Sequence, residues 1–396
     1  MPEAFLVGGV RTPFGRYGGA VAGARPDDLA ALVVRAAVDR AGVADSDVDE
    51  VVLGAANQAG EDNRNVARMA VLLAGLPEAI PAYTVNRLCG SSLTAIASAA
   101  QAVKAGEADL VVAGGVESMT RAPWVIAKPA KPWAKPGEVL DTSLGWRFAN
   151  PRLGEVDGGL ATLAMGETAE EVASLDGISR ADSDAYALRS HERAVAAIKD
   201  GVLAPDLVAV PAPAGPVEVD EGPRPDTSLE RLAHLRPVFR DGGVVTAGSS
   251  SPLSDGAGAV VVASTAAVQR HGLARRARVV GSASAGVAPH LMGLGPVPAT
   301  AKALARAGWG AADLDAVELN EAFAVQVLAC QRRLGLDPER VNADGGAIAV
   351  GHPLGASGVR LAITLLGRLE RAGGRRGLAI MCVGVGQGVA LLVERP

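Results

Sequence analysis

The stretch AGVADSDVDEVVLGAANQ, residues 41–58, has a counterpart in AGWGAADLDAVELNEAFA, residues 307–324. Both run from a helix end through an acidic loop into an apolar strand, and both share an Ala-Gly pair and two aspartates. Self-similarity of this kind is typical of a duplicated unit. The pair therefore predicts two copies of one α/β unit in a single chain.

The segments that follow the two copies also correspond. Residues 84–118 read TVNRLCGSSLTAIASAAQAVKAGEADLVVAGGVES, and residues 340–388 repeat their order of extended piece, glycine-rich turn, helix and strand. Chance likeness between α/β segments is the alternative, and the matching order of several elements argues against it. We expect the glycine-rich turns of both halves to meet in one crevice.

The texture of the sequence changes between the halves, over residues 119–246. Residues 121–139 are rich in Pro and Lys and predict a loop, because proline removes a backbone donor and fixes φ. Residues 165–201 have helical periodicity, with Ser179 and Asp182 as the expected caps. We expect this insert to form a lid or a binding domain over the crevice.

Three units follow from these patterns. The first half comprises residues 1–118 and 247–268, because the sequence returns there to a Gly/Ser turn and a buried strand. The insert is 119–246, and the second half is 269–396. Aromatic residues make up only 3% of the chain, and its 49 glycines suit close packing of helices on a sheet, so the predicted class is α/β.

Net charge and cysteine content indicate which kinds of partner and which cellular compartment to expect. A net charge of −5 and the lack of basic blocks argue against a nucleic-acid partner. The three cysteines have no disulfide-like spacing, which indicates a reducing compartment. The N-terminus shows no basic region followed by an apolar run, and no apolar run in the sequence is long enough to cross a bilayer. We therefore expect a cytoplasmic protein without a membrane partner.

Cys89 stands where the Gly/Ser turn leads into an Ala-rich helix. The positive potential of a helix N-terminus lowers a thiol pKa and favours the nucleophilic thiolate. A buried and inert cysteine is the alternative, since most intracellular cysteines are of that kind. We expect Cys330, inside a helical run, to be such a residue.

His352 lies in a second glycine-rich turn before a helix, GHPLGASG. A histidine beside a cysteine can take its proton, and the ring N–H can also bond to a developing oxyanion. A metal ligand is the rival role, but no other His, Cys or acid stands at ligand spacing. We therefore predict no metal site.

Cys382 follows an apolar strand and precedes the glycines of VGVGQG. A thiolate there can move a proton at a carbon atom, while glycine N–H groups face a substrate oxygen. A dinucleotide loop is excluded, because a strand rather than a helix follows. Asn320 and Glu321 end another apolar strand, and they either face a site or cap a helix.

Taken together, NRLCGSS around Cys89, NEAFA after Asn320, GHPLGASG around His352 and MCVGVGQG around Cys382 resemble the signature blocks of the thiolase family. The blocks occur in family order over essentially the whole chain. The resemblance implies two βαβαβαββ halves stacked as αβαβα layers, with a loop domain inserted in the first half. It also implies coenzyme A (CoA) thioesters as substrates and no permanently bound cofactor.

The resemblance assigns a role to each of these residues. Cys89 would carry the acyl group, His352 would activate it, and Cys382 would be the acid and base at the substrate α-carbon. His352 would form one oxyanion hole with a water held by Asn320. The backbone N–H groups of Cys89 and Gly384 would form the other.

Contacts to CoA carry over from the same likeness. The family positions that line its channel correspond to Met165, Arg224, Phe239, Ser251, Ala322 and Phe323. An arginine near the nucleotide makes physical sense, because a guanidinium stacks on adenine and pairs with phosphate. The chain departs from the family pattern at Arg231, Ser249, Pro252 and Val385, which puts local contacts in doubt.

Within the family, the chain resembles the 3-oxoadipyl-CoA thiolase group of aromatic-compound degradation. General 3-oxoacyl-CoA and acetoacetyl-CoA substrates stay open as alternatives. A dicarboxylic substrate requires a cation for its distal carboxylate, and the candidates are Arg147, Lys128, Lys131 and Lys135. These lysines could instead form a solvated loop or an oligomer contact.

Two rival functions stay open on the sequence. One is a decarboxylating 3-oxoacyl synthase, which shares the duplicated fold but not Cys382. The other is an inactive CoA-binding scaffold, in which Cys89 is unreactive. Family likeness further implies a homotetramer or a homodimer.

Overall fold

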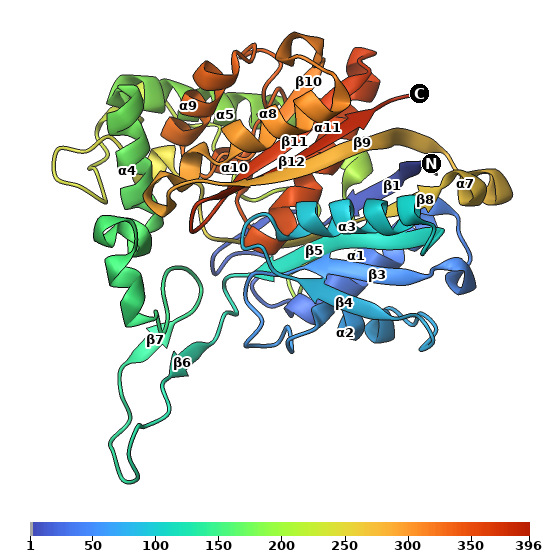
Figure 1. Ribbon diagram of the computed structural model, residues 1–396, viewed down its shortest axis with the longest axis horizontal. Helices are drawn as coiled ribbons and strands as arrows, with labels where there is room; N and C mark the ends of the chain where they lie inside the picture. Colours follow the sequence, from blue (N-terminus) through green and yellow to red (C-terminus); the bar gives the residue numbers. More distant parts are fainter. Residues whose placement is uncertain (1–2) are drawn as a thin grey trace.

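A computed structural model describes residues 3–396, and one mixed sheet of ten strands runs through it (Figure 1). The order across the sheet is β4 (Ala82–Val85), β3 (Glu50–Gly54), β5 (Leu110–Ser118), β8 (Ser254–Ser264), β1 (Ala4–Arg11), β9 (Arg275–Gly286), β12 (Gln387–Glu394), β11 (Arg376–Val383) and β10 (Ala316–Leu319). The short β2 (Gly15–Arg16) pairs with β8.

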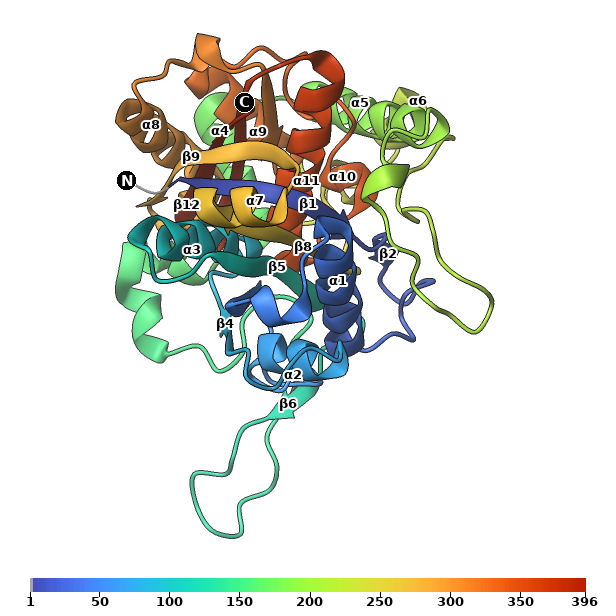
Figure 2. The same ribbon diagram turned by 90° about the vertical axis from the view of Figure 1, so that its right-hand side faces the viewer.

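The two halves of this sheet repeat one strand order. The first half reads β1, β8, β5, β3, β4, and the second reads β9, β12, β11, β10, with a bridge from Val317 to Val341 in the place of β4. β3 is parallel to β5 as β10 is to β11, whereas β8 and β12 are antiparallel to these neighbours. The halves join where β1 pairs with β9 (Figure 2). The predicted duplication is therefore confirmed.

Helices complete the expected αβαβα layers. On the outer face of the first half lie α1 (Pro26–Ala41) and α2 (Val66–Leu73), and on that of the second lie α8 (Pro296–Ala307) and α9 (Ala324–Leu334). Between the halves lie α3 (Ser91–Ala105) and α11 (Leu354–Ala372), which pack on each other and on strands of the sheet. The buried apolar residues accordingly form one core beneath each outer layer and one around the central pair.

The segment between β5 and β8 builds elements of its own. It contains β6 (Trp124–Ile126), β7 (Val139–Asp141), α4 (Met165–Asp176), α5 (Arg180–Lys199) and α6 (Leu229–Ala233). The predicted caps of α5 are confirmed, because Ser179 and Asp182 form a reciprocal capping box. The boundaries of the three units, 1–118 with 247–268, 119–246 and 269–396, stay a prediction.

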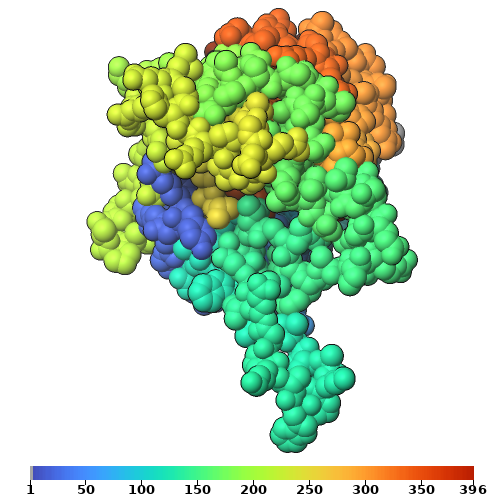
Figure 3. Space-filling view, turned by 90° about the vertical axis from the view of Figure 1, so that its left-hand side faces the viewer, coloured from blue at the N-terminus to red at the C-terminus, as the bar shows by residue number. Residues whose placement is uncertain are grey.

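The Pro/Lys-rich segment is not entirely a loop. Its ends pair as β6 and β7 in a separate antiparallel hairpin, which projects from the body of the molecule (Figure 3). The prediction was wrong at these ends because the six paired residues include no proline, so each keeps its backbone donor. The remaining elements are α7 (Thr265–His271), α10 (Ala347–Val350) and short 3₁₀ turns.

Candidate active site

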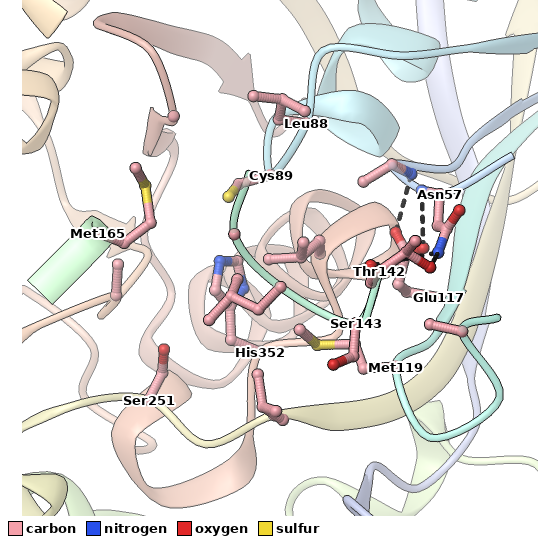
Figure 4. A pocket seen from close by; sticks show the side chains of 18 of the residues that line it. Asn57, Leu88, Cys89, Glu117, Met119, Thr142, Ser143, Met165, Ser251 and His352 are labelled. Atoms are coloured by element: carbon pink, nitrogen blue, oxygen red, sulfur yellow. Dashed lines mark hydrogen bonds between the residues drawn. The ribbon is translucent and has the colours of Figure 1, made fainter. Parts of the chain in front are cut away.

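A cavity of about 390 Å³ is lined by segments of both halves and of the insert (Figure 4). Its size suits a small-molecule ligand. Eight residues singled out from the sequence as catalytic or CoA-binding line it: Cys89, His352, Cys382, Gly384, Met165, Ser251, Ala322 and Phe323. The expectation that glycine-rich turns of both halves meet in one crevice is thus met by this cavity.

Cys89 stands on a strained turn between β4 and α3. The preceding residue, Leu88, has φ +46°, a left-handed conformation that few non-glycine residues adopt. Side chains on both sides hold the turn: Asn86 accepts from the Leu88 N–H at 2.9 Å, and the Ser91 hydroxyl donates to the Leu88 carbonyl at 2.6 Å. The strain is therefore fixed locally, and Cys89 faces the cavity two residues before α3 begins.

Burial dominates the ionisation of Cys89. Removal from solvent raises its pKa to about 11, although N–H groups of Gly384 and of Cys89 itself donate to the sulfur and oppose that rise. The prediction of a thiol acidified by the helix N-terminus was wrong, because desolvation outweighs these local donors. At neutral pH the residue is a thiol, and it needs a base to become a nucleophile.

His352 is buried and lines the same cavity as that thiol, and its ring is fixed by Ser357. The Ser357 hydroxyl donates to the Pro353 carbonyl at 2.9 Å and lies 2.6 Å from His352 Nδ1. Because its one proton is already used, this hydroxyl must accept from Nδ1–H. Nε2 is then the nitrogen without a proton, and the side-chain nitrogen of Asn320 lies 3.3 Å from it.

The ring of His352 is neutral at physiological pH. Burial lowers its pKa to about 3, and the charge of Arg360 adds to this effect. The guanidinium of Arg360 is itself held by Glu318 at 3.0 Å. A neutral imidazole with a bare Nε2 can take the Cys89 proton, which matches the predicted role of base.

Asn320 touches the site from behind the cavity wall. It is fully buried after β10, and its side-chain oxygen has no hydrogen-bond partner among the described residues. Buried polar atoms without a partner are uncommon in proteins, so this oxygen is free to hold a further group. Next to it, Glu321 accepts from Tyr186, Ser190, Asn342 and Ile348, so it joins α5 to the second half and lies outside the cavity lining.

Cys382 and Gly384 bring the end of β11 to the other side of Cys89. Cys382 is buried, and desolvation raises its thiol pKa well above the ordinary value. The nearest side-chain atoms to a Cβ at Gly384 would be Leu88 Cδ1 at 3.2 Å and Met165 Sδ at 3.6 Å. A side chain at this position would press on both residues, and the backbone N–H of Gly384 donates to the sulfur of Cys89.

The predicted CoA residues divide into two groups. Met165, Ser251, Ala322 and Phe323 line the cavity, and Phe239 stands behind Phe323 in an edge-to-face contact with ring centroids 6.4 Å apart. Arg224 is exposed and does not line the cavity. It lies instead beside His191, whose Nδ1 accepts from the Arg224 backbone N–H.

Only one of the four candidate cations for a substrate carboxylate lines the cavity. Arg147 does so, and among residues 3–396 no carboxylate oxygen lies within 4.0 Å of its guanidinium. Lys128, Lys131 and Lys135 are exposed instead, in the hairpin loop between β6 and β7. Sequence alone could not separate these cations, because all four lie in one irregular segment.

Several cavity residues carry no signal that the sequence reading used. Glu117, Asn57 and Thr142 form one wall, on the side of His352 away from Met165 (Figure 4). Trp146 lines the cavity next to Arg147 and has a buried indole N–H without a partner. Glu117 had one available signal, since a lone acid near the end of an otherwise mostly apolar strand is unusual.

The described part of the chain shows two absences. Residues 3–396 contain no group of three or more His, Cys, Asp or Glu side chains placed to hold a metal ion. No helix within that range combines the length and apolar character needed to cross a bilayer. The three cysteines are free thiols.

Known proteins resemble this chain along its whole length. The family model "Thiolase, N-terminal domain" matches residues 4–266, and "Thiolase, C-terminal domain" matches 273–395. The chain is 54% identical to the Beta-ketoadipyl-CoA thiolase of Pseudomonas aeruginosa, over 99% of both chains. It is 52% identical to the 3-oxoadipyl-CoA/3-oxo-5,6-dehydrosuberyl-CoA thiolase of Escherichia coli strain K12, over 100% of both. A solved structure of human mitochondrial 3-ketoacyl-CoA thiolase in complex with CoA matches with a TM-score of 0.93 and 39% identity, over 100% of this chain and 98% of that one.

Proposed function

Because the chain belongs to the thiolase family, we propose that it cleaves 3-oxoadipyl-CoA by thiolysis, with the acyl group carried on Cys89. Family membership already makes the chain an acyltransferase that uses CoA as a substrate and catalyses reversible thiolysis of 3-oxoacyl-CoA. The synthase and scaffold alternatives are set aside by the same matches. The substrate and the residue roles are the proposal.

The observation that carries the residue roles is that Cys89, His352 and Cys382 line one cavity. A nucleophile, a neutral base and a second thiol suffice for a two-step acyl exchange. In the first step of thiolysis the Cys89 proton passes to Nε2 of His352, and the sulfur attacks the 3-oxo carbonyl carbon of the substrate. The bond between the α- and β-carbons then breaks, and the acyl group stays on Cys89. His352 returns its proton to the Cys89 sulfur when CoA displaces the acyl group in the second step.

Cys382 exchanges a proton with the α-carbon of acetyl-CoA. In thiolysis the bond between the α- and β-carbons breaks, and the acetyl-CoA carbanion takes a proton from the Cys382 thiol. The raised pKa of that thiol keeps it protonated at neutral pH, as an acid must be. The thiolate then regains a proton after product release, and a second CoA thiol removes the acyl group from Cys89.

The negative charge of each step needs donors at fixed places. For the acyl-cysteine step we assign the N–H groups of Cys89 and Gly384, because both donate toward the Cys89 sulfur. For the carbanion step we assign His352 and a water held by the unpartnered oxygen of Asn320. Met165, Ser251, Ala322 and Phe323 would then contact the CoA arm, while Phe239 supports Phe323 and Arg224 lies farther out.

The substrate proposal rests on Arg147. A cation that lines a cavity and lacks a carboxylate partner can receive one from the substrate, and a guanidinium binds a carboxylate in two parallel hydrogen bonds. The Trp146 indole N–H beside it adds a free donor. Both features fit the distal carboxylate of a 3-oxoadipyl group, and relatives that act on this group by name are about half identical to the chain.

Kinetics on three substrates test this choice. We expect kcat/KM to be higher for 3-oxoadipyl-CoA than for acetoacetyl-CoA or a medium-chain 3-oxoacyl-CoA. Arg147→Ala should lower kcat/KM for 3-oxoadipyl-CoA by about 10²-fold and leave acetoacetyl-CoA within about twofold, since a charged hydrogen-bonded pair contributes about 3 kcal/mol. Lys131→Ala, which removes an exposed cation, is the matched control. Equal losses on both substrates would refute the proposal.

We also propose a cytoplasmic homodimer or homotetramer. Three free cysteines agree with a reducing compartment. The hairpin exposes Trp124, Ile126 and Trp133, and Trp133 is fully accessible, which suits a contact between copies of the chain. Light scattering of the intact protein and of Trp133→Ser tests this. A monomeric wild type would contradict it.

A further inference from the structure

Glu117 is a buried carboxylate at the cavity wall whose contacts come from segments far apart in the chain. It is the next-to-last residue of β5 and is 4% exposed. Its Oε2 accepts from the N–H groups of Ala56 and Gly355, each at 2.8 Å, and its Oε1 accepts from the Asn57 N–H at 3.0 Å. One side chain thus joins the loop after β3 to the start of α11, three residues after His352.

Close backbone packing at the same point leaves the carboxylate little freedom. A Cβ at Gly355 would lie 2.3 Å from the Val116 carbonyl oxygen and 2.9 Å from Glu117 Oε2. Gly355 is also in the first turn of α11, where the positive end of the helix favours an anion. This hydrogen bond links the start of α11, next to the His352 turn, to β5.

The contact continues from Glu117 to the insert. Asn57, which donates its backbone N–H to Glu117, donates its side-chain amide to the Thr142 hydroxyl at 2.9 Å and to the Thr142 carbonyl at 3.3 Å. Thr142 is 2% exposed and precedes the Trp146–Arg147 stretch along the cavity lining. Figure 4 shows Asn57, Glu117 and Thr142 together at this wall.

We propose that Glu117 is a positioning residue whose ionised carboxylate holds the His352 turn against this wall of the cavity. Protonation of Glu117 would then slow acyl transfer. A protonated oxygen facing the Asn57 N–H would place two donors together and break that contact. Burial raises the pKa of Glu117 to about 7, and the three N–H donors oppose the rise. The group therefore changes charge near physiological pH.

The other ionisable groups around Glu117 can be told apart from it. Glu61, Asp62 and Arg121 share a smaller cavity with it, and Asp62 has a pKa raised to about 6 by burial. Asp255 lies on the neighbouring β8, hydrogen-bonded to Ser118. On the main cavity side, the pKa of Cys89 is about 11 and that of His352 about 3, so neither reacting group titrates between pH values of about 6 and 8.

The experiment follows the first half-reaction, acetyl transfer from acetyl-CoA to the enzyme, by rapid quenching and intact-mass spectrometry. For wild type we expect the rate to fall about fivefold from a pH of about 8 to about 6, as one group with a pKa of about 7 and a protonated form about ten times slower require. Glu117→Gln should be about tenfold slower at the higher pH and should change less than about twofold over the range, because it imitates the protonated state. Wild-type speed, or an unchanged pH limb, in Glu117→Gln would overturn the proposal.

Two variants separate this effect from general disturbance. Glu170→Gln changes another buried carboxylate that accepts backbone N–H groups, those of Val244 and Val245, outside the cavity lining. Asp62→Asn removes the neighbouring group that titrates nearest to the same range. Glu170→Gln should keep the pH limb of the wild type. Asp62→Asn should keep a limb of the same size with its midpoint at a lower pH, because the charge of Asp62 raises the pKa of Glu117. Loss of the limb in Asp62→Asn would assign it to Asp62 instead.

Hydrogen exchange on the wild type gives a second test, which depends neither on a folded variant nor on acylation of Cys89. After correction for the intrinsic pH dependence, the amides of Ala56, Asn57 and Gly355 should be more protected at a pH of about 8 than at about 6. Equal protection would refute the role of Glu117. The proposal rests on acylation at Cys89. A wild type that forms no adduct at any pH would count against the proposed function. The hydrogen-exchange result would then still test the role of Glu117.

Discussion

The turn before α3 and the turn before α11 occupy equivalent places in the two halves of the molecule, yet they are built differently. Cys89 stands two residues before the first residue of α3, and His352 stands two residues before the first residue of α11. Cys89 is half-buried and follows the left-handed Leu88, whereas His352 is 5% exposed and is fixed by Ser357.

The comparison teaches how one duplicated turn supplies two chemical roles. Cys89 is accessible to a substrate but, with a pKa of about 11, is not ionised. His352 is held in one tautomer and kept neutral, so it can accept a proton. The Cys89 turn supplies a nucleophile that needs a base, and the His352 turn supplies that base. The pairing of β1 with β9 joins the two halves that carry these turns.

Replacing the nucleophile tests the comparison most severely. Cys89→Ala should lower thiolysis of acetoacetyl-CoA by about 10⁴-fold or more, because no acyl-enzyme can form. A coupled assay of acetyl-CoA production measures the loss. The matched control is Cys330→Ala, which changes a buried cysteine outside the cavity lining and should keep most of the activity. Substantial turnover by Cys89→Ala would break the comparison.

Removing the base should produce a smaller loss that pH can restore. His352→Asn should lower the acylation rate by about 10³-fold near neutral pH, since it loses both a general base and an oxyanion donor. The Cys89 thiol, with a pKa of about 11, then has to ionise by itself, so the rate should rise about tenfold per pH unit between about 8 and 10. A pH profile of acylation measures both effects. His234→Asn, at an exposed histidine, should behave as wild type throughout, and a flat profile in His352→Asn would contradict the assignment.

The second thiol should affect one half of the reaction only. Cys382→Ser should lower overall thiolysis by about 10²- to 10³-fold, because the carbanion loses its proton donor. Acylation of Cys89 by acetyl-CoA should stay within about threefold of wild type. Stopped-flow measurement of the two steps separates them. Equal losses in acylation and in overall thiolysis would place Cys382 in the acylation step and contradict the separate roles proposed for the two cysteines.

The smallest expected effect concerns strain beside the oxyanion glycine. Val385 has φ +63°, which is strained for a β-branched residue. Val385→Gly should therefore raise stability by about 1 kcal/mol, measured as a shift in the denaturation midpoint. Val219→Gly, at an exposed valine without positive φ, should lower stability instead. A destabilised Val385→Gly would show that packing of the valine outweighs its backbone strain.

Sequence reasoning succeeded where the deciding interactions are local. Glycine-rich turns, apolar runs and the repeated pattern at residues 41–58 and 307–324 are read along the chain, and they gave the duplicated α/β fold. The caps at Ser179 and Asp182 are equally local. The same reading singled out Cys89, His352 and Cys382, whose roles remain predictions.

Sequence reasoning failed where contacts between distant segments determine a property of the site. The pKa of Cys89 depends on how much protein surrounds it, which a helix start cannot reveal. Arg224 and Arg147 were both plausible ligands, and only the folded insert places one of them at the cavity. The contact from Glu117 to Gly355 spans 238 residues, so no local pattern predicts it.

The most direct test of the account is peptide mapping of the wild-type protein after brief exposure to acetyl-CoA. We predict one acetyl group per chain, on the peptide that contains Cys89, with Cys382 and Cys330 unmodified. An acetyl group on Cys382, or no adduct on a folded protein, would contradict the account.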